Sequence, residues 1–444
     1  MNLVPLPLQP LNGAATLLAG QKQQGNYWDV LAWAITHHPY VWASHGDDRL
    51  LACGNFPCLI AWADQAIGTD DCDWFTKANE QESVPDWWFG LLGYEQGQYA
   101  DAAPPVKPKL INTPSNIGFY PLGLCVFDGD DTYKPIGKVP PPSAFHQVKV
   151  EQVALALLTD FEPPKPLVTE PEYLHKLSQI KALIAAGQTY ELNLCIPMMG
   201  SGKIQRPAEL FRRMFKTSPA PFATLVKAQD QYLFSASPER FLQKIGPKVW
   251  SQPIKGTAPR HPDIRIDAAI AEALENSEKE RAENMMIVDL VRNDLARHAI
   301  PGSVMVEELI KRYQFQHVHQ LISTISAKPK LGIKMGEVIR AAFPMGSMTG
   351  APKQRTMELI ADLEPYQRGW FSGSAFYRTP NNDWDMNVVI RSLIYDQKTG
   401  QLVVWAGGAI TWDADPEKEY QECLLKAKAL VNLLADVAHQ NSDG

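Results

Sequence analysis

The sequence lacks the cysteine spacing of a cross-linked or zinc-binding protein. Its six cysteines are scattered, with no Cys-x-x-Cys pair and no Cys/His cluster, so neither a disulfide framework nor a zinc site is expected. Long apolar runs are missing as well, since no stretch approaches the roughly 18 residues of a membrane helix. The opening residues, MNLVPLPLQPLNG, lack the charged and apolar regions of a secretory signal. These absences favour a reduced, cytoplasmic protein with no membrane partner.

The sequence has fewer basic residues than acidic ones. The chain has 42 Lys and Arg residues against 49 Asp and Glu, which gives a formal net charge of -7. No broad basic field is therefore expected for phosphate backbones or anionic lipids, so nucleic acid is not a predicted partner. A local cationic pocket is still compatible with this balance. The 444 residues, 45% of them hydrophobic, have ordinary globular composition and suit one to about three domains.

Proline marks the clearest change along the chain. Two proline-rich stretches, 134–142 and 161–166, bracket residues 140–166, where regular structure is not expected because proline fixes φ and has no N–H donor. This pattern predicts a boundary between an amino-terminal region, 1–160, and a second region, 167–437. The first region contains tryptophans that are expected to lie in its core: Trp28, Trp33, Trp42, Trp62, Trp74, Trp87 and Trp88.

The second region mixes helical and strand-like segments. Thr169 and Glu172 form a capping-box pattern, and apolar residues then recur at helical spacing as far as Gly187, which predicts an amphipathic helix. Three later segments are rich in β-branched and aromatic residues and are predicted to be strands: 232–237, 386–395 and 401–410. Because strands and helices do not alternate strictly, we expect an α+β fold.

Two predicted helices each carry a pair of acids one turn apart. Ser277 begins the first, which carries Glu280 and Glu283, and the second carries Glu419 and Glu422. Each pair alone is typical of a solvated helix face. If both pairs faced one cleft, however, four carboxylates would repel one another unless a divalent cation lay among them. Oxygen ligands from two helices would suit Mg²⁺.

Other patterns have both a functional and a structural interpretation. Lys255, in PIKGT, would ordinarily be a solvated lysine, although burial or a cationic neighbour can lower a lysine pKa and produce a nucleophile. The glycine-rich turn at 346–353 could hold an anionic oxygen or simply precede an ordinary helix. At 405–410 a strand-like segment ends in two glycines, which permit close backbone approach or a β-bulge. His317 and His319 lie on one face of a strand-like segment, where structural histidines are favoured over a metal site.

Seven motifs, taken in chain order, resemble the chorismate-binding enzymes: SPERF, PIKGT, RAENMMIVDLVRND, FPMGSMTGAPKQR, DMNVVIRS, AGGAI and DPEKEYQE. They lie within residues 170–436, and FGLLGYE at 89–95 resembles the family's amino-terminal region. The family includes anthranilate, aminodeoxychorismate, isochorismate and salicylate synthases, which act on chorismate with Mg²⁺. The resemblance implies a large α+β fold of two packed, mainly antiparallel sheets flanked by helices, like that of anthranilate synthase component I.

The resemblance also implies roles for individual residues. Glu283 and Glu422 would bind magnesium directly, while Glu280 and Glu419 would act through water or hold the direct ligands. The catalytic residues would be Lys255 as nucleophile, Glu239 of SPERF as acid and His319 near the ring. The substrate's carboxylates would contact Gly256, Thr257, Arg391, Gly407, Gly408 and Lys426.

Lysine at position 255 is typical of the aminodeoxychorismate synthase branch, whereas anthranilate synthases typically have alanine there. The resemblance therefore implies conversion of chorismate and ammonia to 4-amino-4-deoxychorismate on the route to para-aminobenzoate and folate. Anthranilate synthase and an isochorismate-type synthase are alternatives. Ala409 and Phe371, where the family usually has glycine and tyrosine, also leave open a non-catalytic chorismate-binding subunit. The sequence has no Gly-x-Cys-x-Gly turn for glutamine hydrolysis, so a separate glutaminase subunit is expected to supply the ammonia.

Overall fold

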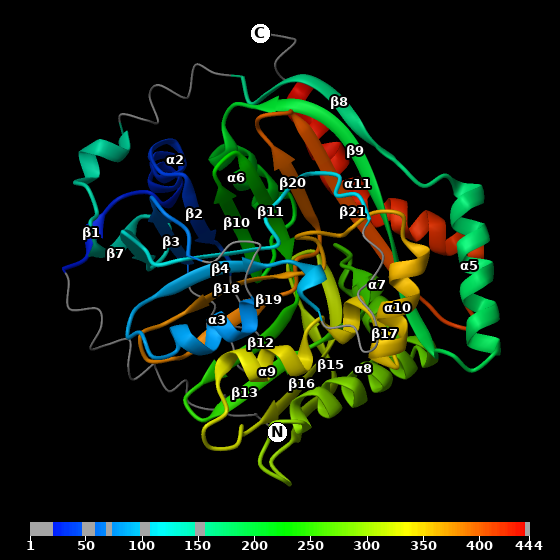
Figure 1. The fold of residues 1–444 in the computed structure, drawn as a ribbon. Coiled ribbons are helices and arrows are strands. Elements are labelled where there is room, and N and C mark those ends of the chain that lie inside the picture. The colour runs from blue at the N-terminus through cyan, green and yellow to red at the C-terminus, as the bar shows by residue number, and fades with distance from the viewer. Residues whose placement is uncertain (1–20, 47–57, 68–72, 98–106, 147–155, 440–444) are drawn as a thin grey trace.

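Two antiparallel sheets form the centre of the protein (Figure 1). The computed structural model describes residues 21–46, 58–67, 73–97, 107–146 and 156–439. The larger sheet contains, in spatial order, β1 (Gln23–Gln24), β7 (Thr132–Gly137), β6 (Gly123–Phe127), β3 (Cys58–Ala63), β2 (Tyr40–Ser44), β10 (Phe222–Ala228), β11 (Gln231–Ser237), β20 (Ser392–Asp396), β21 (Gln401–Ile410), β9 (Glu191–Ile204) and β17 (Gly350–Ala351), with β8 (Leu158–Pro166) also beside β9.

The smaller sheet contains β14 (Ile254–Pro259), β16 (Val318–Ala327), β13 (Lys248–Gln252), β12 (Arg240–Ile245), β19 (Trp384–Asn387), β18 (Ser374–Arg378), β4 (Trp88–Leu92) and β5 (Asn116–Phe119), with β15 (Met305–Gln314) also beside β16. The helices include α2 (Tyr27–His37), α3 (Trp74–Gln81), α5 (Glu170–Ala185), α6 (Pro207–Thr217), α7 (Ile264–Glu275), α8 (Glu278–Ala296), α9 (Met335–Ala342), α10 (Lys353–Leu363) and α11 (Pro416–His439). The short helices η1 (Tyr94–Gln96) and η2 (Gly346–Met348) are of the 3₁₀ type. The α+β prediction is confirmed.

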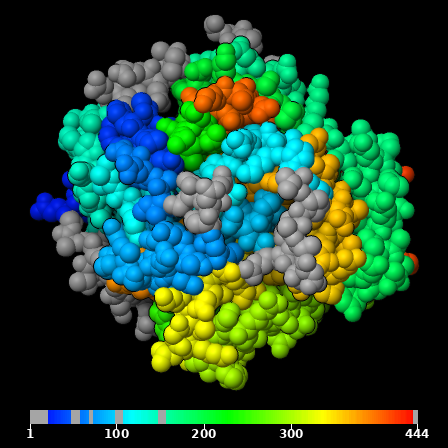
Figure 2. Space-filling view, in the orientation of Figure 1, coloured from blue at the N-terminus to red at the C-terminus, as the bar shows by residue number. Residues whose placement is uncertain are grey.

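Both sheets combine strands from the two regions on either side of the proline-rich stretch. Strand β2 pairs with β10 in the larger sheet, and β4 pairs with β18 in the smaller one. In the space-filling view, the blue to cyan amino-terminal residues adjoin the yellow to orange later residues in one continuous surface (Figure 2). The boundary predicted between 1–160 and 167–437 therefore divides the chain but does not divide the sheets.

The expectation of irregular structure across residues 140–166 is wrong at its carboxyl end. Residues 158–166 form β8, which pairs only with β9 and does so with two register shifts. An edge strand tolerates proline because one side of its backbone needs no hydrogen-bond partner. The prolines therefore specify an irregular edge strand here, where the sequence suggested a linker.

Local signals located the helices correctly. Thr169 and Glu172 make both hydrogen bonds of a capping box before α5, which ends ahead of Gly187, a residue with a φ of 69°. The Ser277 side chain accepts a hydrogen bond from the Glu280 N–H at the start of α8. The second predicted acid-bearing helix, with Glu419 and Glu422, is confirmed as α11, which begins at Pro416.

The segment predicted as one strand at 386–395 is divided between the two sheets. Its first residues belong to β19 in the smaller sheet and its last residues to β20 in the larger one. The chain crosses between them at residues 388–391, where Arg391 has a φ of 51°. Both ends are buried and rich in apolar residues, so the composition of the two ends gave no sign of the crossing. The predicted strands at 232–237 and 401–410 are confirmed as β11 and β21.

The core fills the space on both faces of the larger sheet. Trp42, Trp62, Trp74 and Trp88 are fully buried, as the sequence predicted for the tryptophans of this region. Trp28 and Trp33 are only partly buried and pack against the edge of the core. Among the described residues, no helix has both the length and the apolar character to cross a bilayer.

A buried ion pair connects the SPERF and DMNVV motifs. Arg240 on β12 donates from Nε and Nη2 to the two oxygens of Asp385 on β19, both at 2.9 Å. The Arg240 and Asp385 side chains are 0% and 1% exposed. Gln243 Nε2 also donates to Asp385 Oδ2 at 2.9 Å. This network fixes the start of β12 and thereby the position of Glu239, the preceding residue.

Replacing Asp385 by asparagine is expected to lower the free energy of unfolding by about 3 to 5 kcal/mol, because the Arg240 guanidinium would lose its buried counter-charge. Urea denaturation followed by tryptophan fluorescence measures this. The matched control is Asp160→Asn, which removes an exposed carboxylate from Lys203 and should leave the unfolding midpoint unchanged within error. Equal effects of the two changes would contradict a special role for the buried pair.

Candidate active site

Lys255 occupies an irregular position in β14. The pairing of β14 with β16 shifts register between Ile254 and Thr257, which marks a bulge that redirects the intervening side chains. Gly256 has a φ of 90°, and a Cβ there would lie 3.0 Å from Glu280 Oε2. Glycine therefore provides both the left-handed backbone and the close approach to α8.

Asn284 on α8 holds the Lys255 backbone in place. Its Nδ2 donates to the Lys255 carbonyl at 2.8 Å and to the Glu280 carbonyl at 2.9 Å. The side chain is 2% exposed, so both hydrogen bonds are shielded from water. Sequence analysis noted the RAENMM motif but assigned no role to this asparagine.

The Lys255 ammonium lies between two carboxylates. Its Nζ is 2.7 Å from Glu191 Oε1 and 3.7 Å from Glu283 Oε2. Burial alone would lower the pKa of Lys255, but Glu191 and Glu283 outweigh burial and raise that pKa above its ordinary value. The lowered pKa that would provide a ready nucleophile is not what this structure shows. Lys255 is held as an ammonium and must transfer a proton before it can attack.

Sequence analysis did not identify Glu191. It begins β9, immediately before a run of buried residues, and is 1% exposed. A glutamate at the start of a buried strand was a weak signal, because strand ends are often solvated. Its partner Lys255 is 64 positions away in the chain, and no spacing rule connects the two.

The two acid-bearing helices approach each other from different sheets. Helix α8 packs on β14 and β16 of the smaller sheet, whereas α11 packs on β21 and β8 of the larger one. Lys279 Nζ lies 3.8 Å from Glu283 Oε1 and 3.7 Å from Glu419 Oε1. The structure therefore brings the acids of α8 and α11 to one region, as is required if the two acid pairs are to face one cleft. Lys279, which joins them, was not predicted.

The remaining acids lie at the edges of this region. Gly256 brings the β14 bulge to Glu280, while a Cβ at Gly408 would lie 3.2 Å from Glu419 Oε2. Glu422 Oε1 is 2.7 Å from Lys426 Nζ, one turn further along α11. The four glutamates predicted around a metal thus lie in neighbouring parts of α8 and α11, and lysines contact three of them.

Burial is the main cause of the raised pKa values in this region, whereas the Lys426 ammonium outweighs burial at Glu422 and lowers its pKa. Burial, with repulsion from Glu191 and Glu280, raises the pKa of Glu283 although Lys255 and Lys279 oppose the shift. Burial and Glu422 likewise raise the pKa of Glu419. A region whose carboxylates resist ionisation is one where an added cation would be stabilised.

The donor set suits a hard divalent cation in its chemistry. All the candidate ligands are carboxylate oxygens, which Mg²⁺ prefers. Within the parts of the chain that the structure describes, no three His, Cys, Asp or Glu side chains are gathered closely enough to hold a metal. Instead, the Lys279 ammonium bridges Glu283 and Glu419. A metal would therefore need the carboxylates to turn away from Lys279 toward a common centre.

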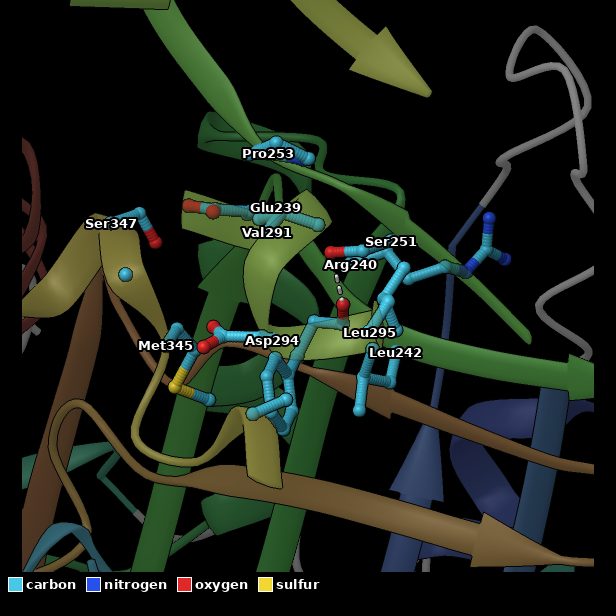
Figure 3. Close-up of a pocket in the computed structure, with 13 residues that line it drawn as sticks. Glu239, Arg240, Leu242, Ser251, Pro253, Val291, Asp294, Leu295, Met345 and Ser347 are labelled. Carbon is cyan, nitrogen blue, oxygen red and sulfur yellow. Dashed lines mark hydrogen bonds between the residues drawn. The ribbon is translucent and has the colours of Figure 1, made fainter. Parts of the chain in front are cut away.

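Glu239 lies in the turn between β11 and β12. It is 5% exposed, and burial raises its pKa to about 7, although the Ser347 hydroxyl and the Lys255 ammonium partly oppose the shift. Figure 3 shows the Glu239 carboxylate pointing toward Ser347 across a cavity that Asp294 also lines. The free volume of this cavity is ≈ 20 Å³, room for about one water molecule. Glu239 can therefore hold a proton near neutral pH.

Hydrogen bonds connect three of the predicted substrate-binding residues, Gly407, Lys426 and Arg391. Lys426 Nζ donates to the Gly407 carbonyl at 3.0 Å, and Arg391 Nη1 donates to the Lys426 carbonyl at 2.9 Å. Thr257, Arg391 and Lys426 line a cavity of ≈ 170 Å³. Two cations and a hydroxyl on one wall suit an anionic ligand.

Glycine is required at the position in β21 whose carbonyl Lys426 contacts. A Cβ at Gly407 would lie 2.4 Å from Cys195 Sγ and 2.6 Å from the Leu194 carbonyl oxygen. The next position, Ala409, pairs with Asn193 on β9. Phe371, the other departure from the family pattern, is buried and stacks on Trp405 with ring centroids 5.6 Å apart.

His319 lies beside the strand that carries Lys255 but has a different partner. It pairs with Ala258 in the β14–β16 ladder, and its Nε2 lies 3.0 Å from Asp267 Oδ1 on α7. The Arg260 guanidinium hydrogen-bonds to Asp267 and holds the pKa of that carboxyl well below its usual range. A catalytic role for His319 stays a prediction.

Comparison with known proteins places this site in a family. The family model described as "chorismate binding enzyme" matches residues 37–432. The chain is a chorismate-binding enzyme. Aminodeoxychorismate synthase component 1 of Salmonella typhimurium is 36% identical over 360 residues, which cover 78% of this chain and 76% of that protein. Aminodeoxychorismate synthase component 1 of Escherichia coli is 34% identical over 350 residues, with the same coverage.

The chorismate-binding enzyme also has solved structural neighbours. Anthranilate synthase component I of Streptococcus pneumoniae superposes with a TM-score of 0.69 at 22% identity, covering 97% of this chain and 99% of that one. This likeness establishes the shared fold and confirms the predicted arrangement of two large sheets flanked by helices.

Proposed function

We propose that this chain is an aminodeoxychorismate synthase component that replaces the C4 hydroxyl of chorismate with an amino group. The observation that carries the proposal is the buried Lys255 amine, set among carboxylates where the acid helices α8 and α11 approach each other. The named relatives support the same activity. A lysine so placed supplies a nitrogen nucleophile that a hydroxylating synthase would not need.

In the first half of the proposed reaction, neutral Lys255 forms a bond from Nζ to ring carbon C2. The two ring double bonds shift, and the bond between C4 and its hydroxyl oxygen breaks. Glu239 donates its proton so that the hydroxyl departs as water. Its pKa of about 7 keeps a large fraction of Glu239 in the acid form at neutral pH.

In the second half, ammonia adds at C4, the double bonds shift back, and the bond between Lys255 Nζ and C2 breaks. The Glu239 carboxylate takes one proton from the new ammonium group and returns to its acid form. Lys255 leaves as a neutral amine and recovers a proton. The net change is the exchange of a hydroxyl for an amino group, with release of water.

The substrate's carboxylates are assigned to the cavity that Thr257, Arg391 and Lys426 line. Arg391 and Lys426 would pair with them, and Thr257 would donate a hydrogen bond, because these three residues line one cavity. The backbone of Gly407 and Gly408 would complete this side. Such pairing would orient C2 toward Lys255.

Magnesium is assigned to the acid helices, with Glu283 and Glu422 as direct ligands and Glu280 and Glu419 in supporting positions. The excess of carboxylates and the raised pKa values of Glu283 and Glu419 support this assignment. When bound, Mg²⁺ would neutralise a substrate carboxylate and withdraw electron density from the ring. The ammonia is expected from a separate glutaminase subunit, which the designation "component 1" of the relatives favours.

Purified protein given chorismate, Mg²⁺ and ammonium is expected to form 4-amino-4-deoxychorismate, which differs in mass from anthranilate and from isochorismate and is therefore distinguished from both by mass spectrometry. Glutamine alone is not expected to replace ammonium. Anthranilate or isochorismate as the product would contradict the proposal. Chorismate binding without turnover would favour the non-catalytic alternative.

In the same assay, Lys255→Ala should lower product formation by about 10³-fold or more, because the covalent route is lost. The matched control is Lys248→Ala, which removes a half-exposed lysine from another strand of the same sheet and should leave the rate unchanged. Full product formation by Lys255→Ala would refute the covalent role.

The pH dependence should report Glu239. Because the acid form is the active one, kcat/KM for chorismate should decline as the pH rises through about 7, the pKa of this carboxyl. Glu239→Gln should lose about 10² to 10⁴ in rate and should also lose this decline. If the decline persists in Glu239→Gln, the titration belongs to another group.

Lys279→Met should increase the affinity for divalent ions, because the ammonium that bridges Glu283 and Glu419 would no longer compete for them. A gain of about tenfold is expected from the removal of one nearby charge. Calorimetric titration with Mg²⁺ measures it. Lys418→Met, an exposed lysine on α11, is the matched control, and equal affinities in the two variants would contradict the assignment.

A further inference from the structure

The ordinary pKa of a lysine makes it an ammonium ion near neutral pH, and the proposed attack requires the neutral amine of Lys255. An ammonium has no lone pair, so the attack on C2 depends on a group that removes one proton from Nζ at the right moment. We propose that Glu191 is this catalytic base, accepting the proton from Lys255 before attack and returning it when the lysine leaves. The inference rests on the function proposed above and deepens it.

The geometry singles out Glu191. Its Oε1 lies 2.7 Å from Lys255 Nζ, which is within the range for direct proton transfer. The Glu191 side chain is 1% exposed and that of Lys255 10%. The proton would therefore pass between two fixed atoms, with little competition from bulk water.

Two other carboxylates near Lys255 are less suited to this step. Glu283 Oε2 is 3.7 Å from Nζ, beyond a hydrogen bond, and Glu283 also faces Lys279. Glu239 has to be in its acid form to protonate the leaving hydroxyl, so it cannot accept a proton from Lys255 in the same step. Glu239 would therefore act as the acid and Glu191 as the base.

The second oxygen of Glu191 supports the same role. Oε2 is buried and has no hydrogen-bond partner among the described residues. A carboxylate with donors on both oxygens is stabilised as the anion and becomes a weaker base. Among the described residues, the Glu191 carboxylate therefore has its one hydrogen bond with the atom that must lose a proton.

The proton transfers balance over the cycle. Glu191 changes from carboxylate to carboxylic acid as the Lys255 ammonium becomes an amine, with no net change in charge of the pair. After ammonia has added at C4 and the bond between Nζ and C2 has broken, the free amine takes the proton back from Glu191. The Lys255 ammonium and the Glu191 carboxylate are restored, and no further reactant is needed.

Glu191→Gln tests the proposal, since it keeps the shape of the side chain and removes its basicity. At neutral pH, kcat with chorismate and ammonium should fall by about 10² or more, while KM for chorismate should change little. In the variant the lysine must release its proton to water. The ratio of variant to wild-type kcat should therefore rise with pH, by up to about a hundredfold between about pH 7 and about pH 9, as the neutral fraction of a lysine with its ordinary pKa does.

Glu191→Asp, which keeps a base at a longer distance, should recover part of the rate. Far-ultraviolet circular dichroism and thermal unfolding would verify that each variant is folded. A ratio that stays constant with pH, or an unaffected Glu191→Gln enzyme, would overturn the role of Glu191 and leave the proposed function intact. Wild-type protein that forms no 4-amino-4-deoxychorismate would overturn both proposals.

Discussion

A buried ammonium ion surrounded by carboxylates is the constraint on which the site depends. Lys255 reaches the interior because a bulge in β14 redirects its side chain, and its charge is tolerated there because Glu191 and Glu283 face it. Without both partners, the ammonium would be an uncompensated charge in a poorly solvated space. Electrostatic attraction, as well as packing, therefore holds strand β14 against strand β9 and helix α8.

The same excess of carboxylates links structure to chemistry. Lysines occupy the spaces between the glutamates of α8 and α11, and Lys279 and Lys426 each contact one or more of them. These contacts show that the region stabilises cations, which is what a magnesium ion and a transient ammonium both require. Burial also gives Glu239 a different role from the more exposed carboxylates. Its pKa of about 7 allows it to hold a proton that they would release.

Local sequence signals were sufficient for the helices and for the acid pairs. Capping residues such as Thr169 and Ser277 specify helix starts through short-range hydrogen bonds, so the face that carries Glu280 and Glu283 followed directly. Long-range pairing could not be predicted in this way. Glu191 meets a lysine 64 positions away. The division of 386–395 between two sheets depends on a crossing that the similar, strand-like composition of its two ends does not reveal. The acid helices also meet through Lys279, whose role depends on the packing of two different sheets.

The most direct test of the account is to look for the lysine adduct itself. Wild-type protein mixed with chorismate and Mg²⁺ without ammonium, quenched in acid and digested, would be analysed by peptide mass spectrometry. The account predicts that the peptide containing Lys255 carries the mass of chorismate less one water, and that added ammonium depletes this species as product forms. Product formation at the full rate with no modified Lys255 at any time point would contradict it.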